Sequence, residues 1–175
     1  MTLNYKTISF KLLVNVCFFF FLISCSGEKE EKSFEETSMK KFFLTHMKNS
    51  EKKWDLYCSR AFLDQKQDKI KCYSTEISVY SDSAKISQIN SKTGFGELSK
   101  ESFYLKDGVK IISYSQGLEL YCEKVYFDSQ KEKIYSDLPT TVIKKKENVE
   151  IKSMGFEARS DLSNIKFFKH TTRKI

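Results

Sequence analysis

One segment of this chain occurs twice, and the two copies lie 64 residues apart with no gap between them in the alignment. Six of eight matched positions are identical, and the other two keep an apolar residue. Each copy alternates apolar and polar residues, passes through a polar turn and returns to isoleucine. The repeat therefore predicts one strand-turn-strand unit that is used twice. The matched positions are Trp54, Leu56, Tyr57, Cys58, Ala61, Asp64, Lys69 and Ile70, followed by Leu118, Leu120, Tyr121, Cys122, Val125, Asp128, Lys133 and Ile134.

Short alternating segments continue along the rest of the chain and predict further strands. Turn-forming residues separate them, among them Asp107-Gly108, Gln116-Gly117 and residues 145–148. No amphipathic stretch of 12 or more residues competes as a helix. We expect an all-β domain of about ten antiparallel strands, arranged as a sandwich, barrel or jelly roll. The expected strands include residues 70–72, 77–79, 103–105, 109–111, 142–143, 149–151, 162 and 165–167.

The N-terminal residues carry the ordered features of a bacterial lipoprotein signal. Lys6 and Lys11 are followed by an apolar run at residues 12–23 and then by Ser24-Cys25. This run is shorter than the roughly 20 residues that a membrane-spanning helix needs. The pattern predicts a signal peptide over residues 1–24 and acylation of Cys25, which becomes the new N-terminus. The alternatives are an ordinary signal peptide or a short membrane anchor, with the cysteine incidental.

The rest of the chain divides by composition into a tether, a domain and a tail. Residues 25–53 form the lipidated N-terminus and a charged tether, in which residues 39–53 hold either a short helical turn or a continuing arm. The β domain is expected over residues 54–168, and a basic tail over residues 169–175. After Cys25 the chain keeps 28 Lys and Arg against 23 Asp and Glu. These lysines are scattered, so nucleic-acid binding, which needs a basic stripe, is not expected.

Three cysteines remain once the signal and the lipid site are set aside: Cys58, Cys72 and Cys122. They show no C-x-x-C spacing. Cys58 and Cys122 fill equivalent places in the two copies of the repeat, and we interpret them as small core residues. The alternative is a disulfide between Cys58 and Cys72 on facing strands in an oxidising compartment.

The residue types of catalytic and metal sites are sparse. His46 lies near the tether and His170 in the basic tail, so neither predicts a metal site, and no cofactor motif is present. Asp64 and Asp128 fall in turns, where we expect them to cap the turn. The chain is therefore not expected to be an enzyme.

The order of motifs resembles the LptC family, within the wider OstA-like group of lipopolysaccharide transport domains. The resemblance runs from about Trp54 to Phe168. It is carried by Trp54-x-Leu56-x-Cys58-x-x-Ala61, by residues 77–80 and 89–96, and by Leu105-Lys106-Asp107-Gly108-Val109. It continues through residues 117–128, 134–139 and 154–158. It implies a twisted, partly open β jelly roll of antiparallel strands. Many family members carry a membrane-spanning N-terminal helix, which the predicted lipobox would replace here.

The resemblance implies a non-enzymatic role in a diderm cell envelope. The domain would be a membrane-anchored component of lipopolysaccharide export that faces the periplasm, most naturally at the inner membrane. It would accept lipid from the permease subunits of an inner-membrane ABC transporter and pass it to an LptA-type protein by β-edge pairing. The alternatives are a structural or surface lipoprotein with a partner-binding β domain, or a carrier of another amphipathic lipid.

An apolar groove for acyl chains needs large apolar side chains on one face of the strands. Alternating strands provide such a face, although the same residues would also fill an ordinary β core. The candidates for the groove lining are Trp54, Leu56, Ile70, Ile77, Val79, Phe103, Leu105, Leu120 and Ile134.

Overall fold

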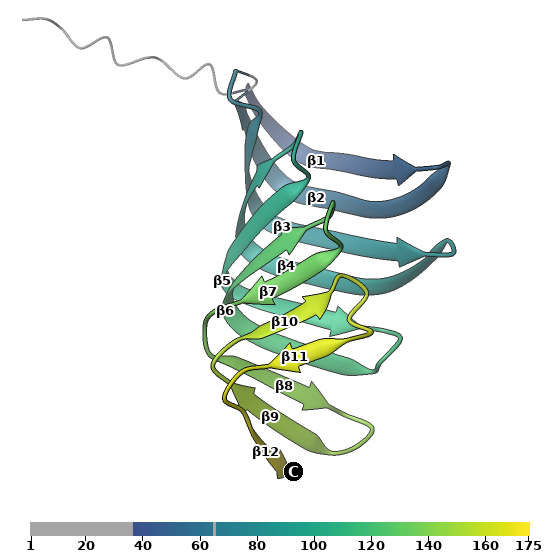
Figure 1. Ribbon diagram of the computed structural model, residues 1–175. Coiled ribbons are helices and arrows are strands. Elements are labelled where there is room, and N and C mark those ends of the chain that lie inside the picture. Colours follow the sequence, from purple (N-terminus) through teal and green to yellow (C-terminus); the bar gives the residue numbers. More distant parts are fainter. Residues whose placement is uncertain (1–36, 65) are drawn as a thin grey trace, which may run out of the picture. The chain divides into compact units, whose positions relative to one another are not determined.

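The computed structural model describes residues 37–64 and 66–175, which form one antiparallel sheet of twelve strands. Strands β1 to β6 pair in chain order, and beyond β6 the sheet branches into β7, β10 and β11 on one path and β8, β9 and β12 on the other (Figure 1). The all-β antiparallel prediction is confirmed. The strands are β1 (Thr37–Lys48), β2 (Glu51–Asp64), β3 (Lys69–Ser81), β4 (Ala84–Glu97), β5 (Ser102–Ser113), β6 (Leu118–Asp128), β7 (Lys133–Ser136), β8 (Thr140–Lys144), β9 (Val149–Ser153), β10 (Phe156–Arg159), β11 (Ile165–Phe167) and β12 (Thr171–Lys174).

The long strands are all interrupted at the same level, and this level divides each of them in two. Ser59 of β2 is skipped in the pairing register with β1 and in the register with β3. Ser74 of β3 is skipped in the register with β4. The ladders of β5 shift register between Lys106 and Val109. Ser74 (φ 49°), Asp107 (φ 68°) and Gly108 (φ 79°) adopt left-handed backbone conformations there. Irregularities of this kind bend a strand and sharpen its twist. We call this row of irregularities the fold line.

The fold line separates two layers of strand segments. Along β6, residues 126–128 pair with β7, whereas residues 118–122 pair with β8. Layer A continues from β7 through β10 to β11, and layer B continues from β8 through β9 to β12. Layer A thus contains residues 60–64, 69–73, 93–97, 102–106 and 124–128 of the long strands, and layer B contains residues 51–58, 75–81, 84–90, 109–113 and 118–122.

The core lies between the two layers. Apolar side chains alternate with polar ones along each strand, so each layer turns one apolar face inward. Leu56 and Leu120 from layer B, and Leu105 and Ile134 from layer A, are fully buried. The Trp54 ring meets the Phe103 ring of the opposite layer edge-on, at a centroid distance of 5.3 Å.

The repeat has the predicted strand-turn-strand form in both copies. The first copy spans β2 and the start of β3, and the second spans β6 and β7. Asp64 Oδ1 accepts a hydrogen bond from the backbone N–H of Gln67, and Asp128 Oδ1 accepts one from that of Lys131, each at 3.0 Å. Both aspartates therefore cap their turns, as the sequence predicted.

Several predicted element boundaries were wrong. Residues 39–48, expected to be a helical turn or an arm, belong to β1, which pairs with β2 along its length. Residues 171–174 of the expected basic tail form β12. Asp107-Gly108 does not end a strand but bends β5 at the fold line. Leu162, expected on a strand, lies in the turn after β10 and is buried there.

Candidate functional site

All nine groove candidates point into the space between the two layers. Trp54, Leu56, Ile77, Val79 and Leu120 come from layer B, and the other four come from layer A. None is more than 6 % exposed. A molecule between the layers would meet an apolar face on either side, but it reaches these side chains only if the layers separate.

The layers meet along two opposed rims, formed by the turns at the ends of the strand segments. His46 of β1 lies on the layer B rim, and its Nδ1 is 3.4 Å from Glu101 Oε1 in the β4–β5 turn of layer A. Ser87 Oγ of β4 donates a 3.0 Å hydrogen bond to the carbonyl oxygen of Ser160, in the turn after β10. Both of these rim contacts are polar, so opening the rims at these two points disrupts the His46–Glu101 contact and one hydrogen bond.

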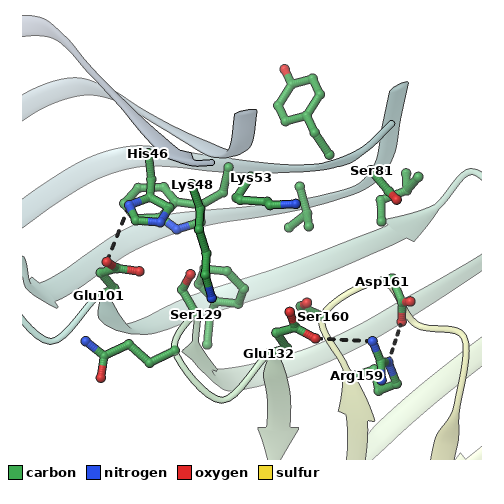
Figure 2. A pocket seen from close by; sticks show the side chains of 16 residues that line it. His46, Lys48, Lys53, Ser81, Glu101, Ser129, Glu132, Arg159, Ser160 and Asp161 are labelled. Atoms are coloured by element: carbon green, nitrogen blue, oxygen red, sulfur yellow. Dashed lines mark hydrogen bonds and ion pairs between the residues drawn. The ribbon is translucent and has the colours of Figure 1, made fainter. Parts of the chain in front are cut away.

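A cavity of about 460 Å³ lies at this mouth between the rims (Figure 2). Trp54, Val79 and Phe127 form apolar parts of its lining. Charged residues from both rims complete it, among them Lys48 and Arg159. The cavity therefore joins the apolar interior to a polar opening.

The cations of the mouth are partly neutralised by nearby carboxylates. Arg159 Nη2 lies 3.2 Å from Glu132 Oε2, and its Nε lies 3.6 Å from Asp161 Oδ1. Lys53 Nζ lies 2.6 Å from Glu51 Oε2. The hydrogen bond to Glu51 raises the pKa of the Lys53 ammonium, which therefore stays charged across the physiological range.

Sequence reasoning found only part of this mouth. Among the nine candidates, Trp54 and Val79 line the cavity, while the others lie deeper between the layers. Phe127 and the charged rim residues were missed, and His46 was set aside as part of a tether. Strand alternation identifies inward-facing residues, but it does not tell which turns of two layers come to face each other.

The disulfide that the sequence left open is present. Cys58 and Cys72 are bonded across β2 and β3, with their Cα atoms 5.4 Å apart. Cys122 is a free thiol, and burial raises its pKa to about 12. A thiol with that pKa stays protonated and is a poor nucleophile.

The stack of strands leaves pairing edges at both ends. Within residues 37–64 and 66–175, β1 pairs only with β2, while β11 pairs only with β10 and β12 only with β9. Strands at a sheet edge offer backbone N–H and C=O groups to a further strand.

The expected lipidation site, Cys25, lies outside the described residues. Residues 37–64 and 66–175 contain no helix long and apolar enough to cross a membrane. The same residues contain no group of three or more His, Cys, Asp or Glu side chains placed to hold a metal ion.

Comparisons with known proteins agree with this architecture. A family model described as "Lipopolysaccharide-assembly, LptC-related" matches residues 11–174. No curated protein sequence matches the chain. Among solved structures, the fold is similar to LptH of Pseudomonas aeruginosa, described as the LptA-homologous periplasmic component of the lipopolysaccharide transport device. That likeness has a TM-score of 0.53 at 10% sequence identity, and covers 65% of this chain and 80% of LptH. The open antiparallel sheet thus has the LptA-type β-jelly-roll fold.

Proposed function

Because this chain belongs to the LptC-related lipopolysaccharide-assembly family and is a non-enzymatic component of lipopolysaccharide transport, we propose that lipid acyl chains pass between its two layers. The observation that carries the proposal is the continuous apolar face on each layer, to which all nine candidate residues contribute. Burying each methylene group of an acyl chain contributes about 0.8 kcal/mol. The burial of a long acyl chain would therefore offset the loss of the apolar contacts that the two layers make with each other.

The mouth gives this groove a route of access. Parting the rims at His46–Glu101 and Ser87–Ser160 exposes Trp54 and Val79 without breaking any strand pairing. Acyl chains then slide inward while the polar head stays outside the apolar groove. The domain is a conduit in this scheme, and ATP hydrolysis in the inner-membrane transporter supplies the energy.

The two edges of the sheet assign one end of the groove to the protein that delivers lipid and the other end to the protein that receives it. An acylated Cys25 would hold the N-terminal end at the inner membrane, with β1 toward the transporter's permease subunits. The edges of β11 and β12 would then receive an LptA-type protein by strand addition, which extends the groove from one protein into the next.

A photo-crosslinker placed at neighbouring residues of opposite orientation tests the groove. Leu56 and Leu120 face inward, whereas the adjacent Tyr57 and Tyr121 are 38% and 36% exposed on the outside. We expect crosslinks to lipopolysaccharide from the two leucine positions only, and only while the transporter hydrolyses ATP. Equal capture from the tyrosine positions would refute the groove.

Two further experiments separate this proposal from its alternatives. Digestion by protease added outside intact cells would favour a surface lipoprotein, and extraction of a different lipid from the purified domain would favour another cargo. Replacing Cys25 by alanine is expected to release the protein from the membrane fraction. Unchanged retention would identify the apolar run at residues 12–23 as the anchor.

A further inference from the structure

Two residues that line the mouth cavity, Trp54 and Lys48, carry donors without a protein partner among residues 37–64 and 66–175. Trp54 is 3% exposed, and within these residues its buried Nε1–H has no hydrogen-bond partner. Leaving a buried N–H unpaired costs about 1–3 kcal/mol, so the position favours an acceptor that arrives from outside. Among the described residues, no carboxylate forms an ion pair with Lys48. Figure 2 shows the Lys48 side chain reaching from its own rim toward Ser129 on the opposite rim.

Two further side chains, His46 and Arg159, flank these donors. The His46 ring stacks on the Trp54 ring with a centroid distance of 5.2 Å and an interplanar angle of 9°. This stacking holds the imidazole against the indole ring. Arg159 approaches from the layer A rim. Ammonium, guanidinium and indole N–H groups in one cavity are the donors that recognise a phosphate group.

Carboxylates of the mouth lie against two of these side chains. Glu101 lies against His46, and Glu132 and Asp161 lie against Arg159. A phosphate carries more charge and more acceptor oxygens than a carboxylate, so it competes for the same donors. Since His46–Glu101 is one of the contacts that join the rims, a phosphate that takes His46 away from Glu101 also loosens the mouth.

We propose that this cavity binds a phosphate group on the head of the transported lipid, with Lys48, Arg159 and the Trp54 N–H as the donors. This inference rests on the proposed groove and assigns the head of the lipid to the mouth. The acyl chains would enter past Val79 and Phe127, which line the same cavity beneath the charged rim. Phosphate binding thereby couples recognition of the cargo to opening of the groove.

Trp54 is the only tryptophan of the chain, so its fluorescence reports directly on the site. The purified protein is titrated with three probes: a bisphosphorylated acylated disaccharide in detergent, its phosphate-free counterpart, and inorganic phosphate. We expect the bisphosphorylated lipid to shift the Trp54 emission and to bind at least tenfold more tightly than either other probe. Lys48→Gln is expected to remove at least tenfold of that affinity.

Lys110→Gln is the matched control, because Lys110 lies on the outer face of layer B, away from the mouth. It is expected to leave the affinity unchanged. Lys48 is exposed, so unaltered circular dichroism and ligand-free emission will verify that its variant is folded.

Equal binding of the phosphate-free lipid would overturn the phosphate site and leave the acyl groove standing. Equal binding of inorganic phosphate would show a site for free phosphate and would overturn its link to lipid. Binding of none of the three probes would overturn both proposals.

Discussion

The two copies of the repeat continue into the same topology, but three strands that are unbroken after the first copy are divided after the second. Strands β3, β4 and β5 each cross the fold line. Their counterparts 64 residues later are each divided in two, into β7 and β8, β9 and β10, and β11 and β12. One member of each pair lies in layer A and the other in layer B. The structural repeat therefore extends well beyond the matched residues. The C-terminal half has the same strand order as the N-terminal half, but three of its strands are interrupted at the fold line.

Residues at the first two of these three cuts account for the difference there. Pro139, which follows β7, has no N–H to donate to a ladder, and Gly155 adopts φ 139° between β9 and β10. In the first copy a left-handed residue such as Ser74 bends β3 without ending it. A bend keeps the layers connected through one strand, whereas a cut lets each segment pair independently.

The cysteines differ between the copies in a related way. Cys58 and Cys72 are bonded in the first copy, and the corresponding residues of the second are Cys122 and Ser136. Ser136 Oγ instead donates a 2.6 Å hydrogen bond to the carbonyl oxygen of Lys124 and accepts one from the N–H of Leu138. The disulfide of the first copy is thus replaced in the second by two hydrogen bonds of Ser136, which fix the backbone where the chain leaves β7.

Of the residues that distinguish the two copies, Gly155 is the one whose substitution we expect to destabilise the protein most. A Cβ at residue 155 would lie 2.6 Å from the carbonyl oxygen of Ser136, at a φ that side chains rarely adopt. We expect Gly155→Ala to lower the free energy of unfolding by about 3 kcal/mol or more, measured by urea denaturation. Gly117→Ala is the control, since its Cβ would approach only the Lys146 side chain at 3.4 Å, at φ 64°. It should cost about 1 kcal/mol. Equal losses would show that the cut does not depend on glycine.

Removing the disulfide makes the first copy resemble the second. Cys58 and Cys72 are 14 residues apart, and a cross-link closing a loop of that size stabilises by about 3 kcal/mol. The double variant Cys58→Ser with Cys72→Ser should lose about 2–3 kcal/mol in chemical denaturation. Cys122→Ser, which breaks no cross-link, should lose less than about 1 kcal/mol. A double variant as stable as the native protein would mean that the cross-link is not formed in solution.

Installing the missing cysteine makes the second copy resemble the first. Ser136→Cys should allow a bond to Cys122, because β6 and β7 repeat the register of β2 and β3. We expect a net gain of about 1 kcal/mol, since the lost hydrogen bonds of Ser136 offset part of the cross-link. Peptide mapping by mass spectrometry would detect the linked pair. Two free thiols after oxidation would show that the cut has moved the two positions apart.

Asp55 and Glu119 occupy equivalent positions and give the smallest expected effect. Hydrogen bonds from Lys145 and Tyr121 lower the pKa of Glu119 to about 2. Burial works against the ionised form of Asp55, but hydrogen bonds from Lys52, Thr45 and Tyr80 leave its pKa lowered. Both groups therefore stabilise the fold above their unfolded pKa values near 4, and this contribution is lost as the pH falls toward 2.

At pH 7, Glu119→Gln should cost about 0.5 kcal/mol, because Lys145 is largely exposed and its ion pair is screened. Asp55→Asn should cost about 1 kcal/mol, since Asp55 is buried and accepts three hydrogen bonds. Thermal unfolding of each variant and the native protein across pH 2–7 measures this, and the differences should shrink below pH 4. A cost that stays constant down to pH 2 would assign it to packing and not to charge.

The sequence by itself determined the local units of this protein. The spacing of apolar residues in Trp54-x-Leu56-x-Cys58 and in its repeat decides which side chains share a face, and the structure buries each of the nine candidates accordingly. Asp64 and Asp128 identified their turns, because a carboxylate can cap a turn using neighbouring N–H groups alone. These features depend on residues only a few positions apart. Residues 39–53 were misread because β1 obtains its pairing partner from β2 and not from its own pattern.

Only the tertiary structure decided how the strands bend and what the bends bring together. Asp107-Gly108 has the composition of a turn, and its role as a bend inside β5 follows from the ladders on both sides. The choice of Cys72 as partner for Cys58, with Cys122 left free, depends on the register of β2 and β3. The mouth joins His46 to Glu101 and Ser87 to Ser160, pairs that are far apart in the chain. Contacts between two layers depend on where the fold line falls, and the two-residue period of a strand carries no information about that position.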